Sequence, residues 1–139
     1  MKITSSLLVG LLGLSLVGCA DMAQNKINKT MTAEDYKTPK NYKTILPAEI
    51  KSSLKDPYSS QITLYSGPKF TSFRPGFLAD YYGYGVCYSV NAKNSYGGYV
   101  GEKLFMFLMD GDKIVWYDNQ SMDVSIKNSN ISRFCNNLK

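Results

Sequence analysis

The residue types that most often carry enzyme chemistry are sparse in this sequence of 139 residues. There is no His, which excludes Ser-His-Asp and Cys-His nucleophilic sites, His-ligated zinc and an imidazole general base. The acidic residues Asp80, Glu102 and Asp118 are scattered, and no pattern indicates that two of them converge. No glycine-rich phosphate loop precedes a helix, and no Cys cluster has metal-site spacing. We therefore expect a protein without catalytic residues, metal or cofactor.

Two short motifs could still be taken for active-site fragments. Ser52 and Lys55 match the Ser-x-x-Lys pattern of penicillin-binding enzymes, but those folds need a much longer chain and two further motifs. Asp110 and Asp112 flank Gly111, and a calcium loop would need several more oxygen ligands at fixed spacing. Asp-Gly is common in tight hairpin turns, so both motifs favour a structural role.

The least generic segment is 81–101, which holds six of the 11 tyrosines and five of the 11 glycines. Tyrosine offers a broad amphipathic contact area at low entropic cost, which suits recognition of a protein or a sugar. The alternative is a Tyr-rich pair of strands around a long hairpin. The predicted binding residues are Asn91, Lys93, Asn94, Tyr96, Gly97, Gly98 and Tyr99.

The N-terminus has the organisation of an export signal. A positive start at Lys2 precedes an apolar run over 7–17, which is too short to span a bilayer. The run ends in Leu16-Val17-Gly18-Cys19, which resembles the lipobox of bacterial lipoproteins. The resemblance implies that residues 1–18 are cleaved as a signal peptide and that Cys19 carries a diacylglycerol and an N-linked acyl chain such as palmitate. An ordinary secretory signal with a chance Cys is the alternative.

The resemblance also implies a destination. Ala20 stands where these lipoproteins carry Asp when they are retained at the inner membrane, so we expect anchoring in the outer membrane, at its periplasmic or its surface face. Residues 19–44 lack an apolar period and are rich in Asn, Lys and Thr, which predicts a lipid-anchored flexible tether with brief helix around 31–36. An electrostatic hold on anionic lipid or peptidoglycan is the alternative for this tether.

With Cys19 assigned to lipid, two cysteines remain for an oxidising compartment. Cys87 lies in an alternating, strand-like segment, and Cys135 lies on the apolar stripe of a helix. We expect a Cys87–Cys135 disulfide, with two free buried thiols as the alternative.

Periodicity predicts an α+β fold over 45–139: an antiparallel meander of about four strands with short N-terminal and C-terminal helices and one disulfide. The run 104–109 is apolar at every position, so its strand should be central and covered on both faces. The expected elements are a helix over 46–55 with Pro47 in its first turn, strands over 62–65, 84–92, 99–109 and 113–117, an irregular stretch over 69–82, a loop over 94–98, a tight turn over 110–112, and a helix around Cys135.

Three segments of the predicted domain resemble a group of small, uncharacterised exported bacterial proteins. The first is Leu54-Lys55-Asp56-Pro57-x-Ser59, the second is Gly85-Val86-Cys87, and the third reads VNAKNxxGGYxG from Val90 to Gly101. The resemblance implies a shared fold and brings no activity with it.

Together these features predict a non-enzymatic outer-membrane lipoprotein that binds an envelope protein or peptidoglycan around the 91–101 loop. One alternative is a periplasmic inhibitor, for example of lysozyme, although a basic domain suits a cationic enzyme poorly. A cell-wall hydrolase accessory is the other. Nucleic acid is not an expected partner, because much of the excess Lys lies in the tether and the compartment is wrong.

Overall fold

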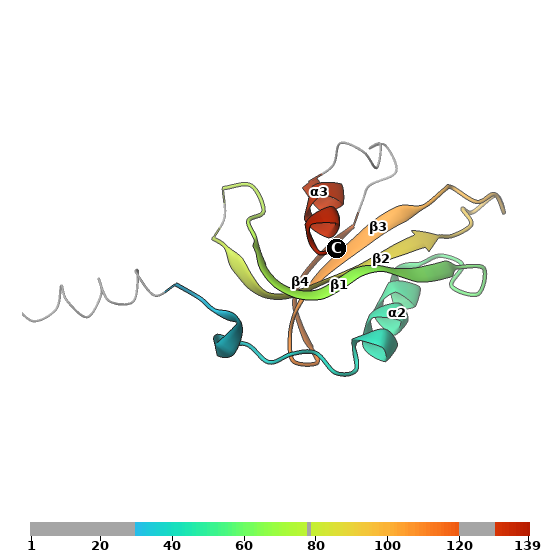
Figure 1. Ribbon diagram of the computed structural model, residues 1–139. Coiled ribbons are helices and arrows are strands. Elements are labelled where there is room, and N and C mark those ends of the chain that lie inside the picture. Colours follow the sequence, from blue (N-terminus) through green and yellow to red (C-terminus); the bar gives the residue numbers. More distant parts are fainter. Residues whose placement is uncertain (1–29, 78, 120–129) are drawn as a thin grey trace, which may run out of the picture. The chain divides into compact units, whose positions relative to one another are not determined.

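The fold is organised around one antiparallel sheet whose four strands are ordered as in the chain, β1-β2-β3-β4 (Figure 1). The computed structural model describes residues 30–77, 79–119 and 130–139. The predicted signal peptide, the predicted lipidation site Cys19 and the first part of the predicted tether lie outside these residues. The strands are β1 (Gln61–Phe73), β2 (Tyr81–Asn91), β3 (Lys103–Asp110) and β4 (Lys113–Asn119).

A helix covers each face of this sheet. The short 3-10 turn η1 (Ala33–Asp35) precedes α2 (Tyr42–Ser53), and α3 (Asn130–Asn137) comes near the end of the chain. In Figure 1, α2 and α3 lie on opposite sides of the central strands. The predicted α+β meander with one disulfide is therefore confirmed.

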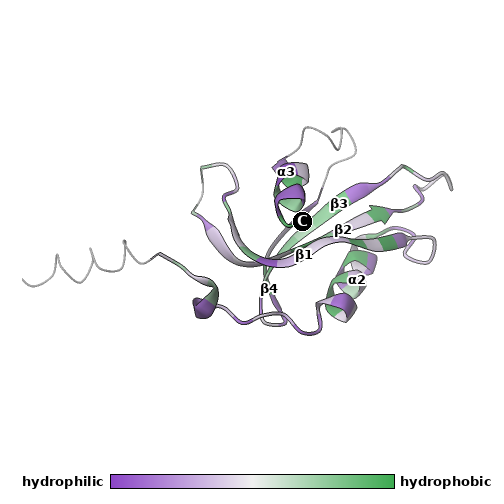
Figure 2. Ribbon diagram, in the orientation of Figure 1, coloured by the Kyte–Doolittle hydropathy of each residue, from purple (hydrophilic) through white to green (hydrophobic). Residues whose placement is uncertain are grey.

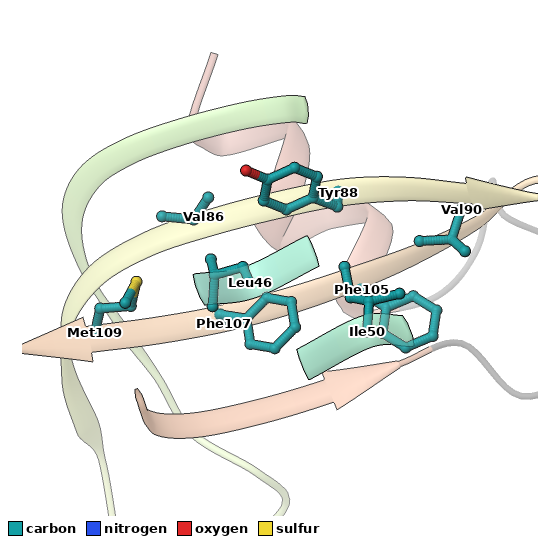
Figure 3. Packing of buried hydrophobic residues seen from close by; sticks show 8 residues of the cluster. All are labelled: Leu46, Ile50, Val86, Tyr88, Val90, Phe105, Phe107 and Met109. Carbon is teal, nitrogen blue, oxygen red and sulfur yellow. The ribbon is translucent and has the colours of Figure 1, made fainter. Parts of the chain in front are cut away.

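The helix α2 packs on one face of the sheet because Leu46 and Ile50, one turn apart, both point toward it (Figure 3). Both side chains are almost completely buried. Alternate residues of β2 and β3 supply the other half of this cluster: Val86, Tyr88, Val90, Phe105, Phe107 and Met109. The alternation follows from the two-residue period of a strand.

The opposite face is covered by α3, which places Ile131, Phe134 and Cys135 against the sheet. Cys135 forms the predicted disulfide with Cys87 of β2, and both residues are fully buried. Since α2 and α3 cover both faces, every residue of 104–109 is buried, as the continuous apolar run predicted. Figure 2 shows that α2 and α3 each carry both hydrophobic and hydrophilic positions.

The strand β1 is much longer than predicted. We expected it to end at Ser66-Gly67-Pro68, followed by irregular chain over 69–82, but it continues to Phe73 through two register shifts. The pairing passes from Ser66 opposite Cys87 to Lys69 opposite Gly85, so Pro68 has no ladder partner. Proline is tolerated at such a bulge in an edge strand, because no ladder hydrogen bond is lost.

The helix α2 begins earlier than predicted, at Tyr42 instead of residue 46, and ends at Ser53 instead of residue 55. Pro47 consequently lies in the second turn and not in the first. The predicted boundary between tether and domain, at residue 45, falls inside this helix, and the compact unit begins at Met31. The brief helix expected around 31–36 is present as η1.

The remaining connections differ in how well they were predicted. The turn between β3 and β4 is tight, since Asp110 pairs with Lys113 across Gly111-Asp112. The strand expected from Tyr99 begins only at Lys103. The connection between β2 and β3 therefore spans 92–102, and it forms the candidate functional site described below.

Candidate functional site

The tip of the β2–β3 connection is closed around one side chain, Asn94. Its Oδ1 atom accepts hydrogen bonds from the backbone amides of Tyr96 at 3.0 Å and Gly98 at 3.1 Å. Its own backbone amide donates to the Gly98 carbonyl at 2.8 Å, and its carbonyl accepts from the Gly97 amide at 3.1 Å. Gly97 has φ = +84°, a conformation that side chains strongly disfavour. The asparagine and the glycine together give the tip a defined shape.

This tip is tied to the segment that follows α2, about 40 residues earlier in the sequence. The Tyr99 hydroxyl donates to the Ser59 carbonyl at 3.2 Å, and the Lys55 ammonium donates to Ser95 Oγ at 3.3 Å. Segments 54–59 and 90–101, on which the expected resemblance rests, are therefore in contact.

A cavity of about 350 Å³ lies where these two segments meet. This volume is at the lower end of the range for small-ligand pockets. Both polar and apolar side chains line it, with three lysines among the polar ones. The lining residues are Ser53, Leu54, Lys55, Val90, Ala92, Lys93, Asn94, Ser95, Val100, Lys103, Phe105 and Asn119.

Two of the three lining lysines have neutral partners. Lys55 bonds to Ser95, and the Lys93 ammonium lies 5.4 Å from the centre of the Tyr99 ring. Within the described part of the chain, none of the three lining lysines forms an ion pair with a carboxylate. The described lining therefore carries three cationic side chains and no acidic one.

Exposed aromatic rings surround the same region. Tyr96 at the tip and Tyr58 beside Ser59 are 97% and 100% exposed, and Tyr99 is about half exposed. Large exposed rings that no core contact explains are typical of surfaces that meet a partner.

The structure separates the predicted binding residues into three groups. Lys93 and Asn94 line the cavity. The residues over 96–99 form the adjacent tip. Asn91 belongs to neither group: strand alternation places it on the face of Cys87, where its buried Oδ1 has no hydrogen-bond partner among the described residues.

Sequence reasoning missed part of the cavity. The sequence pattern could have pointed to Leu54 and Lys55, because they open the first segment of the expected resemblance. No sequence pattern pointed to Lys103 or Asn119. Each lies at the end of a strand, and only the register of the sheet brings it to the cavity.

The two discarded motifs have structural roles. Ser52 donates to the Glu49 carbonyl at 2.7 Å while Lys55 bonds to Ser95, so they do not form a nucleophile–base pair. Asp110 Oδ1 accepts from the Lys37 amide at 2.7 Å. Among the described residues, no group of three or more acidic or Cys side chains could hold a metal ion.

Asp112 binds the chain just before α2. One of its carboxylate oxygens accepts from the amides of Asn41 at 2.9 Å and Lys40 at 3.1 Å, and the other accepts from Asn41 Nδ2 at 2.6 Å. Hydrogen bonds from Asn41, followed by the one from Lys40, lower the pKa of the Asp112 carboxyl. The hairpin turn therefore anchors the start of α2.

Comparisons with protein families, curated proteins and solved structures found no match to this chain. No helix in the described residues is long and apolar enough to cross a membrane.

Proposed function

We propose that this protein is a non-enzymatic lipoprotein of the bacterial outer membrane that binds another envelope component, a protein or peptidoglycan. Cys19 anchors it, and the contact surface consists of the 92–102 connection together with segment 53–60. One observation supports this proposal best: these two segments meet at a cavity with uncompensated lysines and exposed tyrosines.

The polar groups of the described cavity lining are hydroxyl, amide and ammonium groups. Ser53 and Ser95 are the hydroxyl side chains in the cavity lining, and no carboxylate lines it within the described residues. A serine nucleophile needs an adjacent base, and the group that contacts Ser95 Oγ is the Lys55 ammonium, which donates a hydrogen bond to it.

The anchor is tested by Cys19→Ser. Wild-type protein is expected to incorporate labelled palmitate and to fractionate with the outer membrane, because two or more acyl chains bind a bilayer almost irreversibly. The variant should incorporate no label and should leave the membrane fraction. Cys19→Ser protein that still fractionates with the outer membrane would contradict lipid anchoring.

The contact surface is tested by placing a photo-crosslinking amino acid at Tyr96 in living cells. Phe77 is the matched control, because it is fully exposed in the β1–β2 connection at the other end of β2. We expect an adduct from position 96 and none from position 77. Adducts from position 77 alone, or from neither position, would refute the proposed surface.

The adduct also decides between the alternatives. Recovery of lysozyme would indicate an inhibitor. Release of peptidoglycan fragments by the purified protein would indicate a hydrolase and would contradict the non-enzymatic role.

A further inference from the structure

The charge of the cavity points to the chemistry of its ligand, on the basis of the proposed function. Of the described residues that line the cavity, Lys55, Lys93 and Lys103 are charged and none is acidic. These three positive charges favour an anionic ligand.

Two of the lysines have different partners. Lys55 contacts Ser95, whereas Lys93 lies over the Tyr99 ring. A single compact anion would need converging donors, as in a phosphate site.

Three backbone amides at the tip of the loop are not free to act as such donors. The amides of Tyr96 and Gly98 are directed to Asn94 Oδ1, and the Gly97 amide is directed to the Asn94 carbonyl. These amides are therefore occupied within the loop and cannot cradle an oxyanion. Negative charges that are spaced along a ligand fit this arrangement better than one concentrated charge.

Part of the cavity wall is apolar. Val90 and Phe105 are almost completely buried in it, and Leu54 and Val100 lie nearer the surface. Such a wall receives an apolar side chain, since burying it removes hydrocarbon from water. The ligand should thus carry apolar and anionic groups side by side.

We propose that the cavity binds an acidic peptide segment of the partner, with an apolar side chain in the cavity and flanking carboxylates at Lys55, Lys93 and Lys103. Peptides meet this requirement because alternate side chains of an extended chain can differ in polarity. The envelope partner is then a protein, and its contact segment is acidic.

The test uses the full chain, purified in a non-ionic detergent, and two pools of fluorescein-labelled pentapeptides. One pool has Asp or Glu flanking a central Leu, Ile or Phe, and the other has Asn or Gln in place of the acids. Fluorescence anisotropy should show binding of the acidic pool that weakens as salt rises, and roughly ten-fold weaker binding of the amide pool.

Variants at one lysine separate charge from folding. Lys103→Gln should weaken binding of the acidic pool about five-fold, whereas Lys103→Arg should preserve it. Lys113→Gln is the matched control, because Lys113 is an exposed lysine at the other end of β4, outside the cavity lining. It should leave binding unchanged.

Several results would overturn the proposal: no binding of the acidic pool, equal binding of both pools, or Lys103→Gln without effect. Competition by inorganic phosphate as strong as by peptide would assign a compact anion instead. Binding to phosphatidylglycerol vesicles that Lys103→Gln weakens, without peptide binding, would assign a membrane surface.

The failure of this proposal can be distinguished from failure of the proposed function. If Lys103→Gln leaves the Tyr96 photo-adduct at full yield, the contact surface stands and the acidic peptide is refuted. If peptides bind as expected but position 96 captures no partner, the proposed function fails and the peptide site stands.

Discussion

At the scale of single residues, Asn94 determines the shape of the candidate surface. Asn94→Ala removes the acceptor for the Tyr96 and Gly98 amides and should lower the free energy of unfolding by about 1 kcal/mol. Hydrogen exchange at these two amides should accelerate. Asn94→Asp retains an acceptor oxygen at the same place and is the matched control. Equal exchange in Asn94→Ala and wild type would show that the tip is held by other contacts.

Asp112 makes a pH-dependent contact. Its native pKa is lowered by hydrogen bonds from Asn41 and Lys40, so their contribution to stability is complete above the ordinary aspartate pKa of about 3.9. It is lost as the pH falls through the lowered native pKa. The amide signals of Lys40 and Asn41, followed by NMR on acidification, should report this midpoint. In Asp112→Asn the two amide signals should show no such transition. In wild type, a midpoint at or above about 3.9 would contradict the assignment.

At the scale of elements, Gly85 sets how closely α3 approaches the sheet. A Cβ atom there would lie 2.9 Å from both Phe134 Cζ and Thr71 Cγ2, and 3.0 Å from Leu138 Cδ1. Gly85→Ala should therefore lower the free energy of unfolding by about 1–3 kcal/mol, because helix and strand contacts must all shift.

Gly98→Ala is the control for this prediction, since the nearest atom to an added Cβ is 3.8 Å away. It should change the free energy of unfolding by less than about 0.5 kcal/mol. Urea denaturation measures both variants. Similar values for the two would show that α3 is free to move away from Gly85 at little cost.

At the scale of the whole molecule, the Cys87–Cys135 bond links β2 to the last helix across a sequence separation of 48. In the chain-entropy description, a loop of this size contributes about 4 kcal/mol. Reduction should therefore lower the free energy of unfolding by about 2–5 kcal/mol, as measured by urea denaturation. The Cys87→Ala/Cys135→Ala double variant should not respond to reductant. Unchanged stability of wild type on reduction would contradict this role.

Local patterns in the sequence were sufficient for much of this fold. The apolar period around Cys135, the unbroken run 104–109 and the turn at Gly111 each depend on neighbouring residues, and the structure confirms all three. The cysteine count, once Cys19 was set aside as a lipid attachment site, predicted the disulfide correctly. Lipidation of Cys19 and location in the outer membrane stay predictions.

Other features depended on residues far apart. The sequence around Gly67-Pro68 reads as the end of a strand, and only pairing with β2 shows that β1 continues through a bulge. The start of α2 depends on Asp112, 71 residues from Asn41. Neither contact leaves a local pattern.

The sequence by itself determined which elements form, because the periods of helices and strands are properties of consecutive residues. Only the tertiary structure decided which polar groups meet. Lys55 follows α2, Lys93 lies in the β2–β3 connection and Lys103 begins β3. The register of the sheet and the packing of α2 bring them to one cavity. Side chains so distant in sequence become neighbours through the burial of apolar faces, which determines their positions without any pattern among the lysines themselves.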